Sequence, residues 1–177
     1  MAQGGQKGIT LTELLVTVAI LMVVMLPISM VLLQGDKNYR IEKDTSDSQR
    51  AVREAMDLIM EDLRQNDSSS ISVYKNNNSS DAAIPALGAP QNSGDVLYGD
   101  VLYIKPDIIY FLGKDGLYKN DGTSSNLAVI GITGFTVSKR LSDSNTVSTI
   151  IDIDLYAKKS PKDRGINLKS SYRIKSN

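Results

Sequence analysis

The feature that most constrains this chain is a long stretch near its start, Leu14 to Leu33, that carries no charged side chain. A helix rises about 1.5 Å per residue, so a helix of about 20 residues matches the roughly 30 Å hydrocarbon core of a bilayer. A secretory signal peptide is the alternative, but its apolar region is typically about 7–15 residues long and precedes a small-residue cleavage site. The stretch here is longer, and Leu32 to Asp36 offers no such site. The sequence therefore predicts one membrane-spanning helix.

Two residues of this segment stand out. Glu13 comes one position before the apolar stretch, and an acidic side chain carried into a bilayer costs on the order of 2.5–3.5 kcal/mol on insertion scales. We therefore expect Glu13 to have a partner. Pro27 lies inside the stretch and lacks a backbone N–H, so we expect it to kink or locally melt the helix.

The composition removes several kinds of chemistry. The chain has no cysteine and no histidine, which excludes disulfides, thiol nucleophiles, zinc sites built on those residues and Ser-His catalysis. Its 20 basic side chains balance its 20 acidic ones, so no overall positive field attracts nucleic acid. We predict a protein that is not an enzyme, with no cofactor, no metal site and no direct nucleic-acid binding.

The residues before the apolar stretch form a short motif. The run Lys7-Gly8-Ile9-Thr10-Leu11-Thr12-Glu13-Leu14 resembles the processing motif of the type IV pilin superfamily. The resemblance implies removal of residues 1–8 by cleavage between Gly8 and Ile9, and methylation of the new Ile9 amine by the same peptidase. It also assigns Glu13 to filament assembly. The chain departs from the family where Ile9 replaces the more usual Phe or Met, and where Thr12 replaces an aliphatic residue.

The same resemblance implies partners and a location. The N-terminal helix, which pilins resembling this one often interrupt with a proline, is expected to pack with the helices of other pilins or pseudopilins. The expected processing and assembly partners are a prepilin peptidase and an inner-membrane assembly platform. The protein is expected in the cytoplasmic membrane as a single-pass protein with its head domain outside the cytoplasm, and then in a cell-surface pilus or pseudopilus.

The rest of the chain predicts a head domain. An amphipathic helix follows, with Val52, Ala55, Met56, Ile59 and Leu63 on one stripe, and charged residues on the other side: Arg50, Arg53, Glu54, Asp57, Glu61 and Arg64. From Asp95 onward the period is two, typical of half-buried antiparallel strands. We predict an α+β fold, a long N-terminal helix on an antiparallel sheet. The boundaries are a leader at 1–8, a membrane and assembly helix at 9–35, and a head at 36–177.

Three segments suggest a narrower resemblance. Arg50 to Arg64, Tyr110 to Tyr118 and Leu127 to Phe135 resemble the J-type minor pseudopilins of type II secretion and the W-type minor pilins. The resemblance implies a minor rather than a major subunit.

Local patterns predict the connections. Asp115-Gly116 lies between two apolar segments and predicts a hairpin over Phe111 to Tyr118. The run Gly94 to Tyr98 is repeated at once as Gly99 to Tyr103, a period too short for a solenoid repeat and therefore a local duplication. Asn76 to Ser93 reads as a long loop, the kind of segment where binding specificity often resides.

Three groups of side chains are candidate sites. Asp115, Asn120 and Asp121 could offer oxygen ligands to calcium, but they lack the spacing of an EF-hand, and turn roles are favoured. Asp152 and Asp154 could be taken for a catalytic pair, but a solvent-facing strand edge is favoured. The tyrosines could belong to the core or to an interface, and the sequence leaves this open; they are Tyr98, Tyr103, Tyr110, Tyr118, Tyr156 and Tyr172.

The favoured function is that of a structural subunit, a minor pilin or pseudopilin of a type IV pilus, competence pilus or secretion pseudopilus. A single-pass membrane-anchored binding protein or adhesin that does not polymerise is the alternative. A tethered hydrolase is disfavoured by the missing histidine and cysteine. The first two differ in one cheap observation, because only a pilin has a mature chain that starts at Ile9.

Overall fold

The computed structural model describes residues 10–76, 87–93, 96–141, 148–159 and 165–175. The chain divides into two compact units, Met1–Glu42 and Lys43–Asn177. Each unit is described by itself below.

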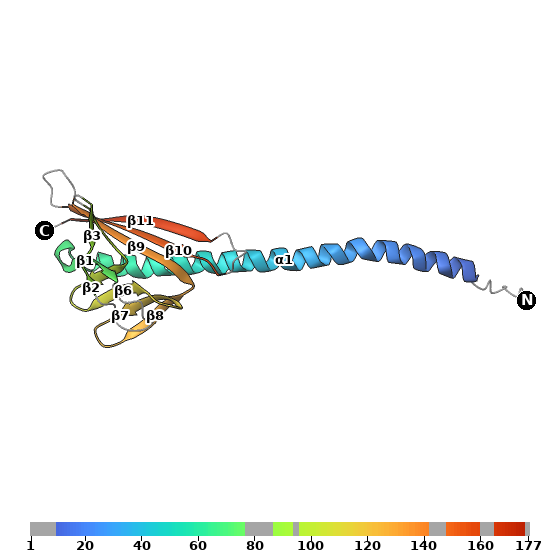
Figure 1. Ribbon diagram of the computed structural model, residues 1–177, viewed down its shortest axis with the longest axis horizontal. Helices are drawn as coiled ribbons and strands as arrows, with labels where there is room; N and C mark the ends of the chain where they lie inside the picture. Colours follow the sequence, from blue (N-terminus) through green and yellow to red (C-terminus); the bar gives the residue numbers. More distant parts are fainter. Residues whose placement is uncertain (1–9, 77–86, 94–95, 142–147, 160–164, 176–177) are drawn as a thin grey trace, which may run out of the picture. The chain divides into compact units, whose positions relative to one another are not determined.

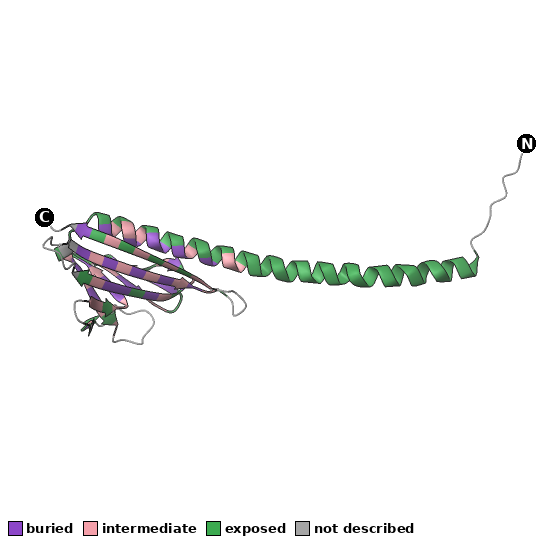
Figure 2. Ribbon diagram, turned by 90° about the horizontal axis from the view of Figure 1, so that it is seen from above, coloured by how far each residue is buried: buried purple, intermediate pink, exposed green. Residues whose placement is uncertain are grey.

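The helix α1, Leu11–Arg64, is 54 residues long. In the second unit its buried side chains are Ser48, Val52, Ala55, Met56, Ile59 and Leu63, and Figure 2 shows buried and exposed residues alternating along this part of the helix. The predicted apolar stripe is therefore confirmed. Arg53, Asp57 and Glu61 are exposed as expected, because only one side of the helix faces the core. The helix ends one turn before Ser68–Ser70, a short 3₁₀ turn.

Antiparallel strands follow the helix, and the predicted α+β fold is confirmed (Figure 1). One sheet has six strands in the order β2-β1-β5-β6-β7-β8, and the other has five in the order β11-β10-β9-β4-β3. The bounds of the first sheet are β1 Ile71–Asn76, β2 Leu87–Gly88, β5 Val101–Ile104, β6 Ile108–Leu112, β7 Gly116–Asn120 and β8 Ser125–Ile130. Those of the second are β3 Gln91–Ser93, β4 Val96–Gly99, β9 Ile132–Leu141, β10 Ser148–Ala157 and β11 Ile166–Lys175.

One hydrophobic core joins the helix to both sheets. Ile59 and Leu63 of α1 belong to the same buried cluster as Leu102 of the six-stranded sheet and Ile151 and Leu155 of the five-stranded sheet. Each of these five side chains is 0 % exposed, and fully burying such a side chain contributes roughly 1.5–3 kcal/mol. The alternation predicted for β10 is confirmed, since Ile151, Ile153 and Leu155 are all buried.

The hairpin predicted over Phe111 to Tyr118 is formed by β6 and β7. Gly113 N donates to Gly116 O at 2.9 Å across the turn. Gly116 has φ 153° and lies so close to β8 that an added Cβ would come within 2.1 Å of Val129 O. Glycine is thus required here by a close backbone approach as well as by its dihedral angle.

The duplicated pentapeptide forms two strands that belong to different sheets. Val96–Gly99 is β4 of the five-stranded sheet, whereas Val101–Ile104 is β5 of the six-stranded sheet. The passage between them lies against β1, where Asp100 N donates to Tyr74 O at 3.1 Å. An added Cβ at Gly99 would lie 2.1 Å from the same oxygen. This close approach lets the chain leave one sheet and enter the other within two residues.

The expectation of a loop from Asn76 to Ser93 was partly wrong. β1 extends to Asn76, and the segment contains β2 and β3, which pair with β1 and β4 respectively. These strands are only two and three residues long, too short for a periodic pattern to show in the sequence. Residues 77–86, the middle of the expected loop, lie outside the described residues.

Candidate processing and assembly segment

The first turn of α1 is closed by a reciprocal pair of hydrogen bonds. Thr10 N donates to Glu13 Oε2 at 2.9 Å, and Glu13 N donates to Thr10 Oγ1 at 3.4 Å. The Thr10 hydroxyl also donates to Glu13 Oε2 at 3.0 Å. This is a capping box, in which residues at the N-cap and three positions later satisfy each other's free backbone donors. The described part of the chain therefore gives Glu13 a local partner that sequence analysis did not name.

The predicted cleavage and methylation sites precede the described part of the helix. Gly8 and Ile9 lie outside the described residues, so cleavage between them and methylation of Ile9 stay predictions. Glu13 is exposed in the single chain, and its assignment to assembly likewise stays a prediction. What the described residues add is that the Glu13 carboxylate already lies at the start of a formed helix.

Hydroxyl groups and a proline modify the helix further along. Thr17 Oγ1 donates to Glu13 O at 2.5 Å, and Ser29 Oγ donates to Met25 O at 2.9 Å. Such bonds satisfy polar side chains within the helix itself, which suits an apolar environment. The helix continues without a break through Pro27. Local melting at this residue is therefore not observed, and the kink stays a prediction.

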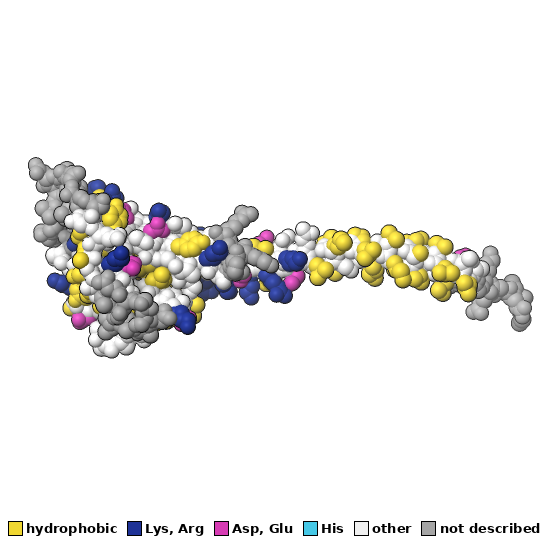
Figure 3. Space-filling view, viewed as in Figure 1, with side chains coloured by type: hydrophobic (Ala, Val, Ile, Leu, Met, Phe, Trp, Pro, Cys, Tyr) yellow, Lys and Arg dark blue, Asp and Glu magenta, His cyan; other side chains and the backbone are white. Residues whose placement is uncertain are grey.

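The segment from Leu14 to Leu33 is exposed throughout in the isolated chain. An 18-residue window of α1 has a mean hydropathy of 2.8, and none of this window is buried. By its length and composition, α1 is long and apolar enough to cross a membrane. Figure 3 shows hydrophobic side chains covering this stretch of the helix. A core helix of a soluble protein would be mostly buried, so this segment is consistent with a membrane-anchored protein.

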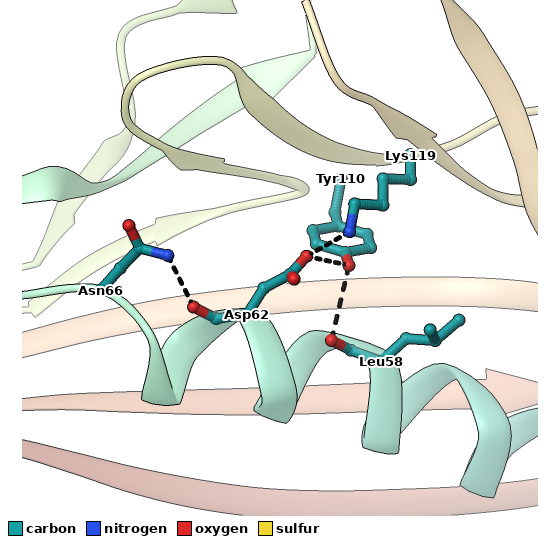
Figure 4. Close-up of polar contacts among 5 residues, drawn as sticks. All are labelled: Leu58, Asp62, Asn66, Tyr110 and Lys119. Carbon is teal, nitrogen blue, oxygen red and sulfur yellow. Dashed lines mark hydrogen bonds and ion pairs between the residues drawn. The ribbon is translucent and has the colours of Figure 1, made fainter.

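A polar cluster that sequence analysis missed attaches α1 to the six-stranded sheet (Figure 4). Tyr110, on β6, is 0 % exposed, and its hydroxyl donates to Asp62 Oδ2 at 2.5 Å. Lys119 Nζ lies 2.6 Å from the same oxygen and 5.6 Å from the centre of the Tyr110 ring. Burial, and then the hydrogen bond to Asp62, raises the pKa of Tyr110 above its usual value. Asn66 completes the cluster by donating to Asp62 O at 2.7 Å.

A second long-range polar contact joins the two sheets. Lys139 Nζ, on β9, donates to Ile71 O on β1 at 2.6 Å. Burial lowers the pKa of Lys139, because removing water disfavours the charged form. The arrangement holds β9 against β1 and offers no free nucleophile.

The residues considered as calcium ligands serve turns. Asp121 Oδ1 accepts from Thr123 N at 3.1 Å, from Thr123 Oγ1 at 2.6 Å and from Ser124 N at 3.2 Å. These bonds hold the pKa of Asp121 at about 2. Asn120 is buried and accepts from Gly122 N at 2.7 Å, while Asp115 O accepts from Gly131 N at 3.1 Å. No group of three or more metal-ligating side chains occurs among the described residues.

Asp152 and Asp154 each face a basic side chain. Arg140 Nη2 lies 2.8 Å from Asp152 Oδ2, and Lys169 Nζ lies 2.8 Å from Asp154 Oδ2. Ser171 Oγ donates to the other oxygen of Asp152 at 2.5 Å. The two carboxylates thus lie in cross-strand ion pairs on the sheet face opposite the core. The expectation of a strand edge was wrong, because β10 is flanked by β9 and β11.

The tyrosines divide between core and surface. Tyr110 is buried in the core cluster, whereas Tyr98 is 40 % exposed. The others are half-buried, namely Tyr103, Tyr118, Tyr156 and Tyr172. Tyr118 stacks on Phe111 with ring centres 5.5 Å apart. Only Tyr110 lies in the centre of the fold, and its partner Asp62 explains why a tyrosine rather than a phenylalanine occupies that place.

Comparison with known proteins gives one match. The profile of the prokaryotic N-terminal methylation motif matches residues 4–29. Comparisons with curated proteins and with solved structures find no match for the chain. The matched residues contain the Gly8–Ile9 bond, the capping box and most of the apolar stretch. The chain therefore carries the N-terminal methylation motif of type IV prepilin-like proteins, which are precursors of structural subunits rather than a family of enzymes.

Proposed function

We propose that this protein is a minor pilin or pseudopilin that is cleaved between Gly8 and Ile9, methylated at Ile9 and assembled into a filament through its N-terminal helix. The observation that carries the proposal is the methylation motif at residues 4–29, which continues directly into an exposed, uncharged helical stretch. Pilin-type subunits are processed by a prepilin peptidase and assemble with other pilins in general. The minor J-type or W-type class rests on the resemblance of the three head-domain segments alone.

Assembly gives a physical role to the exposed apolar stretch. In the membrane its side chains contact lipid, and in a filament they contact the helices of neighbouring subunits, so both states cover the same surface. An anchored adhesin that never polymerises needs the span but not the cleavage motif. The motif therefore favours the filament subunit over that alternative, with the inner-membrane assembly platform as a further proposed partner.

The processing step is tested by the mass of the mature chain. Protein extracted from the membranes of a host with a prepilin peptidase is expected to begin at Ile9, with one methyl group on its amine. A Gly8→Val substitution is expected to leave the precursor uncut, because a side chain then occupies the position next to the scissile bond. Retention of residues 1–8 in the unaltered chain would contradict the proposal.

The assembly step is tested at Glu13. In the proposed filament its carboxylate pairs with the free amine of Ile9, and removing one member leaves an opposite charge unpaired in a low-dielectric bundle, at a cost of several kcal/mol. Glu13→Ala is expected to be processed and retained in the membrane fraction, but absent from sheared filaments. Glu13→Asp is expected to be partly defective, because the shorter side chain reaches the amine less well.

The capping box supplies the matched control. Thr10→Val removes the hydroxyl partner of Glu13 but leaves the carboxylate, and losing a cap costs about 0.5–2 kcal/mol of helix stability. If Glu13 acts in assembly, Thr10→Val enters filaments far better than Glu13→Ala does. Equal loss in the two variants would show that Glu13 only caps the helix. Full incorporation of Glu13→Ala would refute the assembly role of Glu13.

A further inference from the structure

The edges of the two sheets differ in how they are protected against pairing with another chain. Among the described strands the four edges are β2, β3, β8 and β11. β2 and β3 have only two and three residues, and β11 carries Lys169, Arg173 and Lys175 along its length. Short edge strands and edge lysines are common devices that prevent edge-to-edge pairing. β8 has six residues, and none of them is charged.

β8 also exposes apolar side chains. Ile130 is 71 % exposed and Leu127 is 38 % exposed, and the chain has no charged residue from Gly122 to Ser138. A register shift lies in the β7–β8 pairing between Leu117 and Tyr118. Leu127 is therefore opposite Tyr118, while Val129 is opposite Leu117 and is buried in the core. The bulge lets β8 contribute to the core and still present Leu127 on the outer face.

Leu127 is the end of an apolar row that crosses the sheet. The paired positions run Tyr74, Val101, Phe111, Tyr118 and Leu127, one from each of β1, β5, β6, β7 and β8. Val101 is 0 % exposed and Phe111 is 2 % exposed, but exposure rises to 38 % at Leu127. Cross-strand apolar pairs are a main source of sheet stability. The row ends at β8, the edge strand of the six-stranded sheet. A further strand paired with β8 would continue both the sheet and the row.

We propose that β8 pairs antiparallel with β8 of a second copy of this chain, joining two six-stranded sheets edge to edge. When a strand pairs with its own copy about a two-fold axis, the residues next to the axis lie opposite their own symmetry mates. A charged side chain next to the axis would then face its mate and repel it. The absence of charge from β8 meets this condition, whereas β11 would bring basic side chains together. The contact is separate from helix packing in a filament.

The chain's composition makes the test clean, because it has no cysteine. Asn126→Cys places a thiol on β8, and Asn167→Cys places one on β11 as the matched control; both asparagines are exposed and lie on edge strands. Each full-length variant is expressed with two different tags in one cell, and its membranes are treated with a mild oxidant. We expect Asn126→Cys to give disulfide dimers containing both tags, at least tenfold more than Asn167→Cys gives.

A charge on the strand provides the second arm. Adding Leu127→Lys to Asn126→Cys is expected to reduce the dimer at least tenfold, because two lysines then come close across the two-fold axis. Asn167→Lys, at an exposed position of β11, in the same Asn126→Cys background, should leave the dimer unchanged. Resistance of the head domain to protease confirms that both variants fold.

Three results would overturn the proposal. The first is equal cross-linking of the β8 and β11 thiols, which would indicate random encounters of anchored chains. The second is a dimer that persists with Leu127→Lys in a folded head domain. The third is cross-linking of Asn126→Cys only to a different protein, which would mean that β8 serves a partner other than a second copy.

Discussion

Removal of one hydroxyl group tests how α1 is attached to the six-stranded sheet. Tyr110→Phe keeps the ring in the core and deletes only the group that donates to Asp62 Oδ2 at 2.5 Å. A hydrogen bond to a charged group contributes about 1.5–3 kcal/mol. Lys119 remains 2.6 Å from the carboxylate, so the charge keeps one partner. We therefore expect a loss of about 1.5–3 kcal/mol in the free energy of unfolding.

Urea unfolding of a head-domain fragment, followed by circular dichroism, measures this loss. Tyr118→Phe is the matched control, because the Tyr118 hydroxyl makes no hydrogen bond with the described residues and the side chain is half-buried. Its loss should be below about 0.5 kcal/mol, as is usual for substitutions away from such contacts. The m-value should not change in either variant, since the area exposed on unfolding is the same.

A double-mutant cycle assigns the loss to the contact. Asp62→Asn and Tyr110→Phe should each destabilise the fragment, and together they should cost less than the sum by about 0.5–3 kcal/mol. Additive losses would show that the two side chains act independently. Equal losses for Tyr110→Phe and Tyr118→Phe would refute the reasoning altogether, because the buried hydrogen bond would then contribute nothing beyond an ordinary tyrosine hydroxyl.

Further expectations follow from the same structure. The fragment Asp36–Asn177 should be soluble, with mixed helix and sheet by circular dichroism, and a coil spectrum would contradict this domain boundary. Above pH 10 its stability should fall, because the raised pKa keeps Tyr110 protonated while the unfolded chain ionises; Tyr110→Phe should lessen this slope in urea unfolding. Gly99→Ala should make the head sensitive to protease, since its Cβ would lie 2.1 Å from a carbonyl oxygen of β1. NMR titration should give Asp121 a pKa of about 2 in the folded head. The stabilisation from its hydrogen bonds is then fully present above pH 3.8, the ordinary pKa of an aspartate, and is lost as the pH falls toward 2. A titration midpoint near pH 3.8 would contradict the turn geometry.

The elements that sequence analysis predicted best are those whose burial is periodic. Val52 and Ile59 recur at helical spacing, and Ile151 and Ile153 alternate with polar neighbours. Both patterns arise because one side of an element faces the core. The burial of these four residues confirms them. The N-terminal methylation motif was also predicted, since it is a compact set of residues at fixed offsets.

What sequence analysis missed depends on partners far apart in the chain. Asp62 lies beside the apolar stripe, and nothing in its neighbours indicates that Tyr110 and Lys119 will reach it from β6 and β7. A partial indication was available, because an acidic residue adjacent to Leu63 falls on the flank of the buried face. The interior position of β10 was missed for the same reason, since strand order is set by pairing and not by local composition.

The repeated pentapeptide has a consequence for how the chain reaches its native pairing. β4 and β5 present the same Val-Leu-Tyr run to different neighbours, so a slip of five residues exchanges identical side chains and costs little in local propensity. Correct registration must then come from outside the repeat. One contact that provides it is the pairing of Ile71 on β1 with Ile104, because Ile104 follows the second copy, whereas Gly99 follows the first. The repeat therefore offers a competing register in which β4 takes the place of β5 beside β1, and such a pairing would have to open before β4 joins β9.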